Sequence, residues 1–187
     1  MNTALEFSRR IYVSTNFSCN LNCVYCFEKN KNDIVFNVEE AVSIIEKMLM
    51  EKTEHGTKIK LHGGEPFLVF PKIKQLCETL WKKQFPEYYH FSVTTNGTLI
   101  HGEIKEWLYE NRDKITLKLS LDGNRKSHNI NRSDSFDRID LKFFVRTWPK
   151  VKLNMVITPA TLLDVCENIK FLHSQGFTQI ISRFSLM

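Results

Sequence analysis

A short β-rich run leads directly into three closely spaced cysteines: residues 10–26 read RIYVSTNFSCNLNCVYC. The first part, Arg10 to Thr15, is rich in Ile, Val and Thr, a composition typical of a β-strand. The polar part that follows places Cys19, Cys23 and Cys26 within eight residues. In α/β folds the functional loops follow the carboxyl ends of the strands, so these cysteines are the first candidates for chemistry.

The alternation of β-rich and helical runs continues along the whole chain with a period of roughly 30 residues. The expected strands are Arg10 to Thr15, Lys58 to His62, His90 to Thr95, Ile115 to Ser120, Val151 to Ile157 and Gln179 to Arg183. The expected helices are Val38 to Glu51, Pro71 to Gln84, Glu103 to Asn111, Phe136 to Thr147 and Thr161 to Ser174. Strands joined by helical crossovers pair in parallel, so the pattern predicts an α/β fold with a parallel sheet.

The composition is that of one soluble globular domain. Of the 187 residues, 42% are hydrophobic and 25% charged, which excludes disorder for most of the chain. No stretch approaches the ~20 consecutive apolar residues that span a bilayer, and the start, MNTALEFSRR, lacks the apolar run of a signal peptide. We therefore expect a cytoplasmic protein with no membrane partner. The net charge of +5 comes from interleaved basic and acidic residues, so no nucleic-acid partner is expected.

Five cysteines in a chain without an export signal favour metal or redox chemistry over a disulfide framework. Thiolates suit zinc and iron–sulfur clusters. Three thiolates leave one iron of a four-iron cluster without a protein ligand, so that iron can chelate a small molecule. The alternative is a structural zinc site completed by His62 or Cys77. Cys77 and Cys166 lie in apolar helical patterns and are expected to be buried structural thiols.

Two motifs together resemble the radical S-adenosylmethionine (radical SAM) enzymes. They are the Cys-x3-Cys-x2-Cys triplet with Tyr25 before its last cysteine, and Gly63-Gly64-Glu65-Pro66 after the second strand. The resemblance implies a partial (β/α)6 radical SAM barrel, a [4Fe-4S] cluster and S-adenosyl-L-methionine as cofactor. It also implies reductive cleavage of that cofactor to a 5′-deoxyadenosyl radical, which abstracts a hydrogen atom from the substrate.

Two further strand-end motifs resemble the peptide- and protein-modifying branch of that family, which includes the anaerobic sulfatase-maturing enzymes. They are Thr94-Thr95-Asn96-Gly97-Thr98 and Ser120-Leu121-Asp122-Gly123. This resemblance implies a peptide or protein side chain as substrate and a reducing partner such as flavodoxin or ferredoxin. For Asp122 two roles stay open: orientation of ribose or substrate, or capping of the turn before Gly123.

The resemblance also implies a role for individual residues. Cys19, Cys23 and Cys26 are expected to hold the cluster. The turn from Gly63 through Gly64 to Glu65 is expected to receive the methionine amino group, with the Glu65 carboxylate accepting from that ammonium or orienting the turn. The other expected cofactor contacts are Tyr25 near the adenine, Ser120 at the ribose, Arg132 at the carboxylate and the Leu186 backbone at the adenine.

The chain departs from that branch at two places. His128 is followed by Asn129 where the branch commonly carries an aspartate. The sequence ends at Met187, just after the sixth strand, so we expect a radical SAM core over residues 1–187 without the last helix and without the cysteine-rich extension that holds auxiliary clusters. The alternative function is a truncated or non-catalytic iron–sulfur or zinc-binding module that acts with a partner protein.

Overall fold

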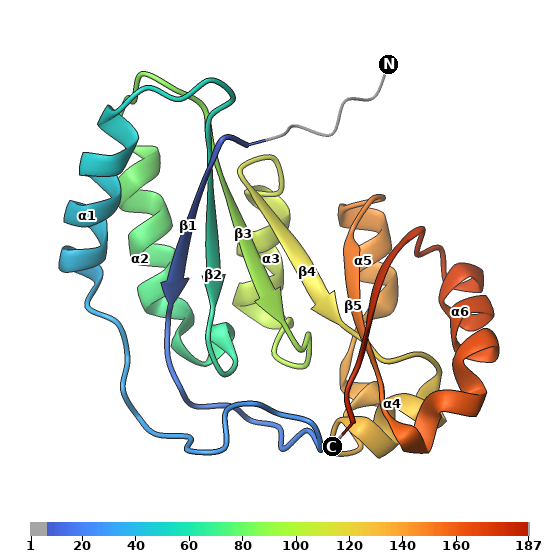
Figure 1. The fold of residues 1–187 in the computed structure, drawn as a ribbon. Coiled ribbons are helices and arrows are strands. Elements are labelled where there is room, and N and C mark those ends of the chain that lie inside the picture. Colours follow the sequence, from blue (N-terminus) through green and yellow to red (C-terminus); the bar gives the residue numbers. More distant parts are fainter. Residues whose placement is uncertain (1–6, 187) are drawn as a thin grey trace.

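The computed structural model describes residues 7–186, in which strands and helices alternate (Figure 1). The strands are β1 (Arg9–Ser14), β2 (Thr57–His62), β3 (Tyr89–Thr95), β4 (Ile115–Ser120), β5 (Lys152–Ile157) and β6 (Gln179–Phe184). The α-helices are α1 (Val38–Met50), α2 (Phe70–Trp81), α3 (Gly102–Glu110), α4 (Arg125–Asn131), α5 (Leu141–Thr147) and α6 (Val165–Ser174). Short 3-10 segments are η1 (Pro66–Val69), η2 (Phe136–Arg138) and η3 (Pro159–Asp164).

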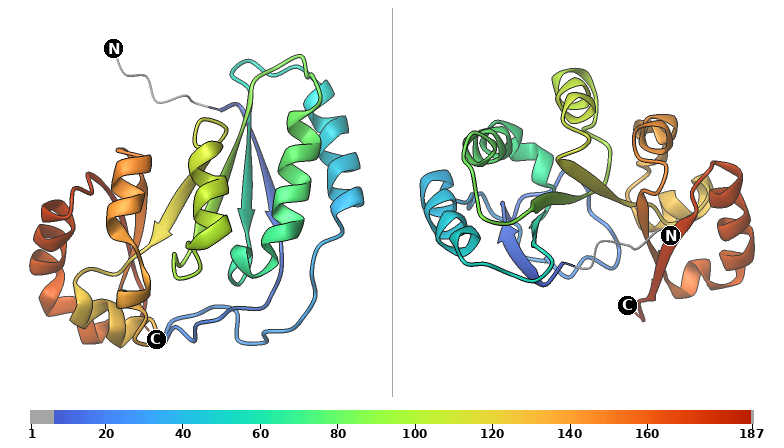
Figure 2. Two further views of the ribbon diagram at one scale, coloured as in Figure 1. Left: turned by 180° about the vertical axis from the view of Figure 1, so that it is seen from behind. Right: turned by 90° about the horizontal axis from the view of Figure 1, so that it is seen from above.

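The sheet is parallel throughout, with the strands side by side in chain order, β1-β2-β3-β4-β5-β6. Because the order never reverses and the crossovers share one hand, the helices all fall on the same side of the sheet. Seen from above, the sheet curls and the helices lie outside it (Figure 2). The predicted fold class, an α/β partial barrel of six parallel strands, is confirmed.

The main core lies between the outer side of the sheet and the helices. Strand alternation turns Ile59 and Leu61 of β2 outward into this layer, where both are fully buried. The intervening Lys58 and Lys60 line the cavity on the inner side. The helices add large apolar side chains to the core: Ile45 and Leu49 from α1, Leu76 and Leu80 from α2, and Leu108 from α3. The inner side of the sheet is thus left to polar residues.

The sequence pattern predicts five helices, but the described residues form six α-helices, and the one that the prediction missed is α4. It begins after Asn124, whose side chain accepts a hydrogen bond from the Ser127 backbone at 3.0 Å. Its buried residues are Ser127, His128 and Asn131, all polar. A seven-residue helix with a polar buried face carries no hydrophobic periodicity, so the pattern that identifies the other helices misses it.

Two predicted helices are interrupted in the structure. The run predicted from Phe136 to Thr147 divides into η2 and α5, because the Asp140 side chain accepts from the Phe143 backbone at 3.0 Å and starts a new helix. The run predicted from Thr161 to Ser174 begins as η3 and becomes α6 only at Val165. No helix in the described part of the chain combines the length and apolar character needed to cross a membrane.

Candidate functional site

The three clustered cysteines lie in the loop after β1, at the carboxyl edge of the sheet (Figure 1). They line a cavity of about 220 Å³ together with residues at the carboxyl ends of β2, β3 and β4, Asn154 of β5, and Arg132, which directly follows α4. The structure therefore brings together most of the residues singled out in the sequence: Cys19, Cys23, Cys26, Tyr25, Gly63, Gly64, Ser120 and Arg132. Glu65 and Leu186 are not among the residues that line it.

All three thiols are unpaired and half-buried. Polar hydrogens point at two of the sulfurs: the Leu21 backbone N–H lies 3.5 Å and the Asn96 amide nitrogen 3.9 Å from Cys19 Sγ, and Arg132 Nη1 lies 3.9 Å from Cys23 Sγ. Burial raises the pKa of both thiols, while Arg132 acts in the opposite direction on Cys23. Such donors stabilise thiolate sulfur once a metal has displaced the proton.

The described residues form no ready-made site for a single metal ion. In residues 7–186, no three His, Cys, Asp or Glu side chains converge closely enough to hold one metal ion. The thiolates of a [4Fe-4S] cluster stand further apart than those of a zinc site, because each binds a different iron. His62 shares the cavity, but Cys77 lies in the core of α2 and is fully buried, away from the triplet. Of the two fourth ligands considered for zinc, only His62 therefore lies at the triplet, and the choice between a cluster and zinc stays a prediction.

The cysteine loop is held by the segment around α4. The Val24 backbone N–H donates to the Asn131 carbonyl at 3.0 Å, and the Asn22 backbone N–H donates to Ser133 Oγ at 2.9 Å. Ser133 and Asp134 both have left-handed backbone angles, with φ of 53° and 49°. Non-glycine residues rarely adopt this conformation, and here it places the Ser133 hydroxyl against the loop.

On the other side, the loop packs against the glycine pair after β2. The Gly64 backbone N–H donates to the Asn16 carbonyl at 3.0 Å, and the Glu65 N–H donates to the Ser18 carbonyl at 2.8 Å. A Cβ at Gly63 would lie 2.4 Å from the Asn16 carbonyl oxygen, and one at Gly64 would lie 2.0 Å from that of Ser18. Only glycine permits this approach. No hydrogen bond from residues 7–186 reaches the carbonyl oxygen of either glycine.

Glu65 joins the ends of β2 and β3 and does not face the cavity. Its carboxylate is buried and accepts from the Asn96 backbone at 2.7 Å, the Thr95 hydroxyl at 2.8 Å and the Phe67 backbone at 3.2 Å. Burial raises its pKa to about 7 despite these donors. Of the two roles considered for this side chain, orientation of the turn agrees with these contacts, and binding of the cofactor ammonium stays a prediction.

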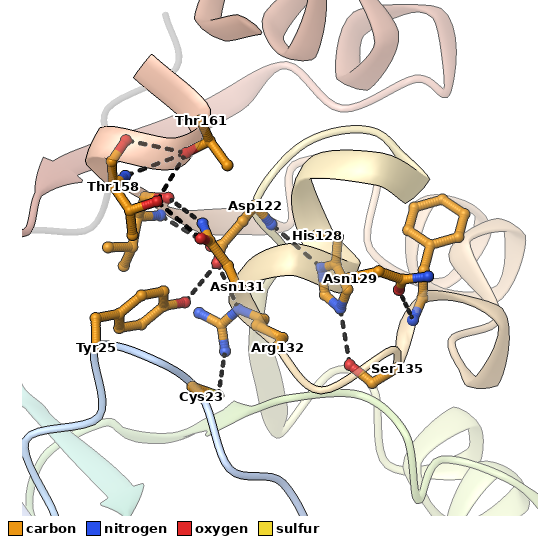
Figure 3. Close-up of polar contacts among 12 residues, drawn as sticks. Cys23, Tyr25, Asp122, His128, Asn129, Asn131, Arg132, Ser135, Thr158 and Thr161 are labelled. Carbon is orange, nitrogen blue, oxygen red and sulfur yellow. Dashed lines mark hydrogen bonds and ion pairs between the residues drawn. The ribbon is translucent and has the colours of Figure 1, made fainter. Parts of the chain in front are cut away.

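Asp122 is the centre of a buried polar network (Figure 3). One carboxylate oxygen accepts from Arg132 Nε at 2.9 Å and from the Tyr25 hydroxyl at 2.5 Å, and the other accepts from the Val156 backbone at 2.8 Å. The Arg132 guanidinium also lies over the Tyr25 ring, 5.3 Å from its centroid. None of these bonds caps the turn before Gly123, and the cap of α4 is Asn124. The other role considered for Asp122, orientation of ribose or substrate, stays a prediction.

His128 supports this network as a neutral ring (Figure 3). The Asp122 backbone N–H donates to His128 Nδ1 at 3.3 Å, so the ring proton is on Nε2, which donates to Ser135 Oγ at 3.0 Å. Burial, with a smaller contribution from Arg132, lowers the pKa of His128 to about 3. The Asn129 side chain accepts from the Phe136 backbone at 3.0 Å, a bond that an aspartate oxygen could equally accept.

Asn154 of β5 belongs to the site although no sequence motif indicated it. Its side-chain oxygen is buried without a hydrogen-bond partner among the described residues, and it lines the cavity opposite Ser120, its register partner on β4. An inward-facing amide on the strand next to the Ser-x-Asp-Gly turn is the signal that could have found it. Leu186 is 93% exposed and lies outside the cavity.

The prediction that Cys166 is a buried structural thiol is wrong. Cys166 is exposed on α6. The apolar residues Val165, Ile169 and Leu172 define the packed face of the helix, and Cys166 is rotated off that face. The corresponding prediction for Cys77 is confirmed, because that thiol is fully buried.

Comparison with known proteins gives a family match over most of the chain. The model described as Radical SAM superfamily matches residues 13–182. A GTP 3′,8-cyclase of Clostridium perfringens is 29% identical over 151 residues, covering 78% of this chain and 45% of that protein. A cysteine-type anaerobic sulfatase-maturating enzyme of the same species is 30% identical over 177 residues, covering 85% and 46%. The chain thus spans about half the length of these relatives.

Solved structures agree with the fold. The structure described as native anSMEcpe with bound AdoMet and a peptide superposes with a TM-score of 0.81 at 25% identity, covering 95% of this chain and 51% of that one. Streptococcus suis SuiB bound to precursor peptide SuiA superposes with a TM-score of 0.73 at 22% identity, covering 95% and 39%. The second likeness concerns the fold alone.

The raised pKa of Glu65 predicts a specific dependence of stability on pH. The folded state holds this proton more tightly than the unfolded chain, whose pKa is 4.5. Its contribution to the free energy of unfolding is therefore fully present below pH 4.5 and is lost as the pH rises through about 7. The Glu65→Gln variant lacks this titration. Relative to it, the free energy of unfolding of the starting protein should fall by up to about 3 kcal/mol as the pH rises through this window.

Urea unfolding of both proteins at several pH values measures this difference, in which the other titrating groups, His128 included, cancel. A difference that stays constant from pH 4.5 to 7 would show that Glu65 has an ordinary pKa.

Asp122→Asn should destabilise the fold by about 3–5 kcal/mol, because it leaves the buried Arg132 without its counter-charge. The matched control is Asp137→Asn, which breaks the exposed ion pair with Arg125 and should cost only about 0–1 kcal/mol. Chemical denaturation of the two variants compares them directly. Equal losses would mean that the buried pair does not hold the site together.

Proposed function

This chain belongs to the Radical SAM superfamily, and we propose that it binds a [4Fe-4S] cluster through Cys19, Cys23 and Cys26 and reductively cleaves S-adenosyl-L-methionine. The observation that carries the proposal is the convergence of three unpaired thiols and a glycine turn with free carbonyls on one cavity. When bound, the cluster and S-adenosylmethionine together supply a 5′-deoxyadenosyl radical that abstracts hydrogen from the substrate. We also propose a cytoplasmic location, because the reducing cytoplasm keeps thiols free of disulfide bonds, as these three are.

The protein's own contribution is to bind and orient these groups. Leu21, Asn96 and Arg132 direct polar hydrogens at the sulfurs of Cys19 and Cys23 and so favour their thiolate forms. A cluster with three protein ligands leaves one iron for the amino and carboxylate groups of S-adenosylmethionine. A reduced flavodoxin or ferredoxin would supply the electron.

Residues around the cavity provide groups of matching chemistry for S-adenosylmethionine. The free carbonyls of Gly63 and Gly64 can accept from its amino group. The Arg132 guanidinium, locked by Asp122 on its Nε side, can meet its carboxylate. Ser120 and the unpaired Asn154 oxygen, facing each other across β4 and β5, suit its ribose hydroxyls. Tyr25, fixed by its bond to Asp122, would border the adenine.

For the substrate we propose a peptide or protein side chain. Support comes from the sulfatase-maturating relative and from the superposition on a peptide-bound structure. The GTP 3′,8-cyclase relatives favour a nucleotide as the second candidate. The third is a cluster-binding module that modifies nothing by itself and acts with a partner protein.

The test is anaerobic reconstitution with iron and sulfide, followed by dithionite reduction with S-adenosylmethionine and chromatography of 5′-deoxyadenosine. The starting protein should bind close to four irons and form 5′-deoxyadenosine, and Cys23→Ala should lose at least about 100-fold of that activity. Cys166→Ala is the matched control, because this thiol is exposed on α6 away from the cavity. A colourless protein with stoichiometric zinc and no 5′-deoxyadenosine would overturn the proposal in favour of the zinc module.

A further inference from the structure

The inner side of the sheet gathers basic residues that are scattered in the sequence. These residues, on β2, β4, β5 and β6, all line one cavity of about 930 Å³, the lumen of the half-barrel. The residues, here called the lumen cations, are Lys58 and Lys60 on β2, Lys118 on β4, Lys152 on β5 and Arg183 on β6. The sequence shows these charges interleaved with acidic residues, and the two-residue period of the strands brings the basic ones to the inner side of the sheet.

The lumen cations have no counter-charges of their own. None of the ion pairs formed within residues 7–186 includes any of them. Lys60 Nζ instead donates to the Tyr12 hydroxyl at 3.2 Å, and Asp113 is the one acidic residue that lines the cavity. Burial, reinforced by the neighbouring cations, lowers the pKa of Lys118 to about 8 and also lowers that of Lys58. Lys58, Lys60 and Lys118 are half-buried, while Lys152 and Arg183 are exposed. Like charges gathered without counter-charges repel one another, so the lumen is suited to a ligand that brings negative charge.

The lumen cations are close neighbours on the inner side of the sheet. Lys118 and Lys152 are register partners on β4 and β5, Lys60 lies beside Ser92 on β3, and Arg183 lies further along, next to Val156. After burial, each of the other four lumen cations contributes to the lowered pKa of Lys118. An extended chain with carboxylates on nearby residues can neutralise such a row of charges.

The lumen is continuous with the cysteine cavity. His62, Thr94 and Asn154 line both cavities, so a ligand in the lumen would reach the site where the radical forms. We propose that the lumen cations bind acidic side chains of the peptide substrate that flank its modified residue. This inference rests on the proposed function, because it takes the substrate to be a peptide.

The test is fluorescence anisotropy with the reconstituted protein and S-adenosylmethionine, without reductant, so that binding is measured without turnover. The probes are two fluorescein-labelled heptapeptides, Glu-Glu-Ala-Cys-Ala-Glu-Glu and its counterpart with Gln in place of Glu. At low salt the acidic peptide should bind at least about 10-fold more tightly, and this advantage should disappear near 0.5 M salt, where charges are screened within about 4 Å.

A triple variant, Lys60→Gln, Lys118→Gln and Lys152→Gln, should reduce the advantage of the acidic peptide to less than about 2-fold. The matched control changes three exposed lysines on the outer side, Lys47, Lys82 and Lys170, to Gln and removes the same net charge. The control should retain the preference. Because the lumen variant relieves repulsion between like charges, it should also melt at a higher temperature than the starting protein at low salt.

Equal affinities for the two peptides would overturn the inference, as would tighter binding of GTP than of the acidic peptide. So would a lumen variant that melts no higher, since its lysines would then already be compensated. The anisotropy measurement requires no 5′-deoxyadenosine, so failure of the proposed chemistry and failure of the acidic-peptide inference give different results.

Discussion

The buried ion pair between Asp122 and Arg132 is the contact on which the site depends. It joins the end of β4 to the end of α4, and through Val156 it reaches β5. The same carboxylate binds the Tyr25 hydroxyl, so the cysteine loop is tied to three separate elements. Removing two charges from water is costly, and the additional donors to the carboxylate, the Tyr25 hydroxyl and the Val156 backbone, offset part of that cost.

A second anchor, built differently, lies on the opposite side of the loop. There the backbone of Asn16 and Ser18 contacts the backbone of Gly63 to Glu65 at distances that exclude any side chain. Glu65 then fastens that turn to the end of β3 through three hydrogen bonds. With an anchor on each side, a loop without regular structure can hold three thiols in a fixed arrangement, which is what a preorganised ligand set requires.

The sequence was most informative where the chemistry leaves a local pattern. The cysteine spacing, the glycine pair and the alternation of strands and helices predicted the fold class and most residues of the cavity. Glycine at positions 63 and 64 is explained by the close approach of another backbone, a contact no pattern within the turn can reveal. The carboxylate of Glu65 illustrates the limit, because its residue type fits both a ligand contact and a structural role, and only the structure shows its burial and its three donors.

Other features depend on spatial neighbours that are distant in sequence. Helix α4 buries polar residues against Asp122 and Ser135, so its own sequence carries no amphipathic signal. The lumen cations lie on four strands up to 125 residues apart, and only the parallel register gathers them. Asn154 is likewise identified by its unpaired oxygen and not by a motif.

The central claim is that three thiolates hold a cluster whose fourth iron is left for S-adenosylmethionine. Electron paramagnetic resonance of the reduced, reconstituted protein tests it most directly, with and without S-adenosylmethionine. The account predicts a [4Fe-4S] signal whose g values shift when S-adenosylmethionine is added, because the cofactor becomes a ligand of the open iron. A [4Fe-4S] signal that stays unchanged at saturating S-adenosylmethionine, or no iron–sulfur signal at all, would contradict it.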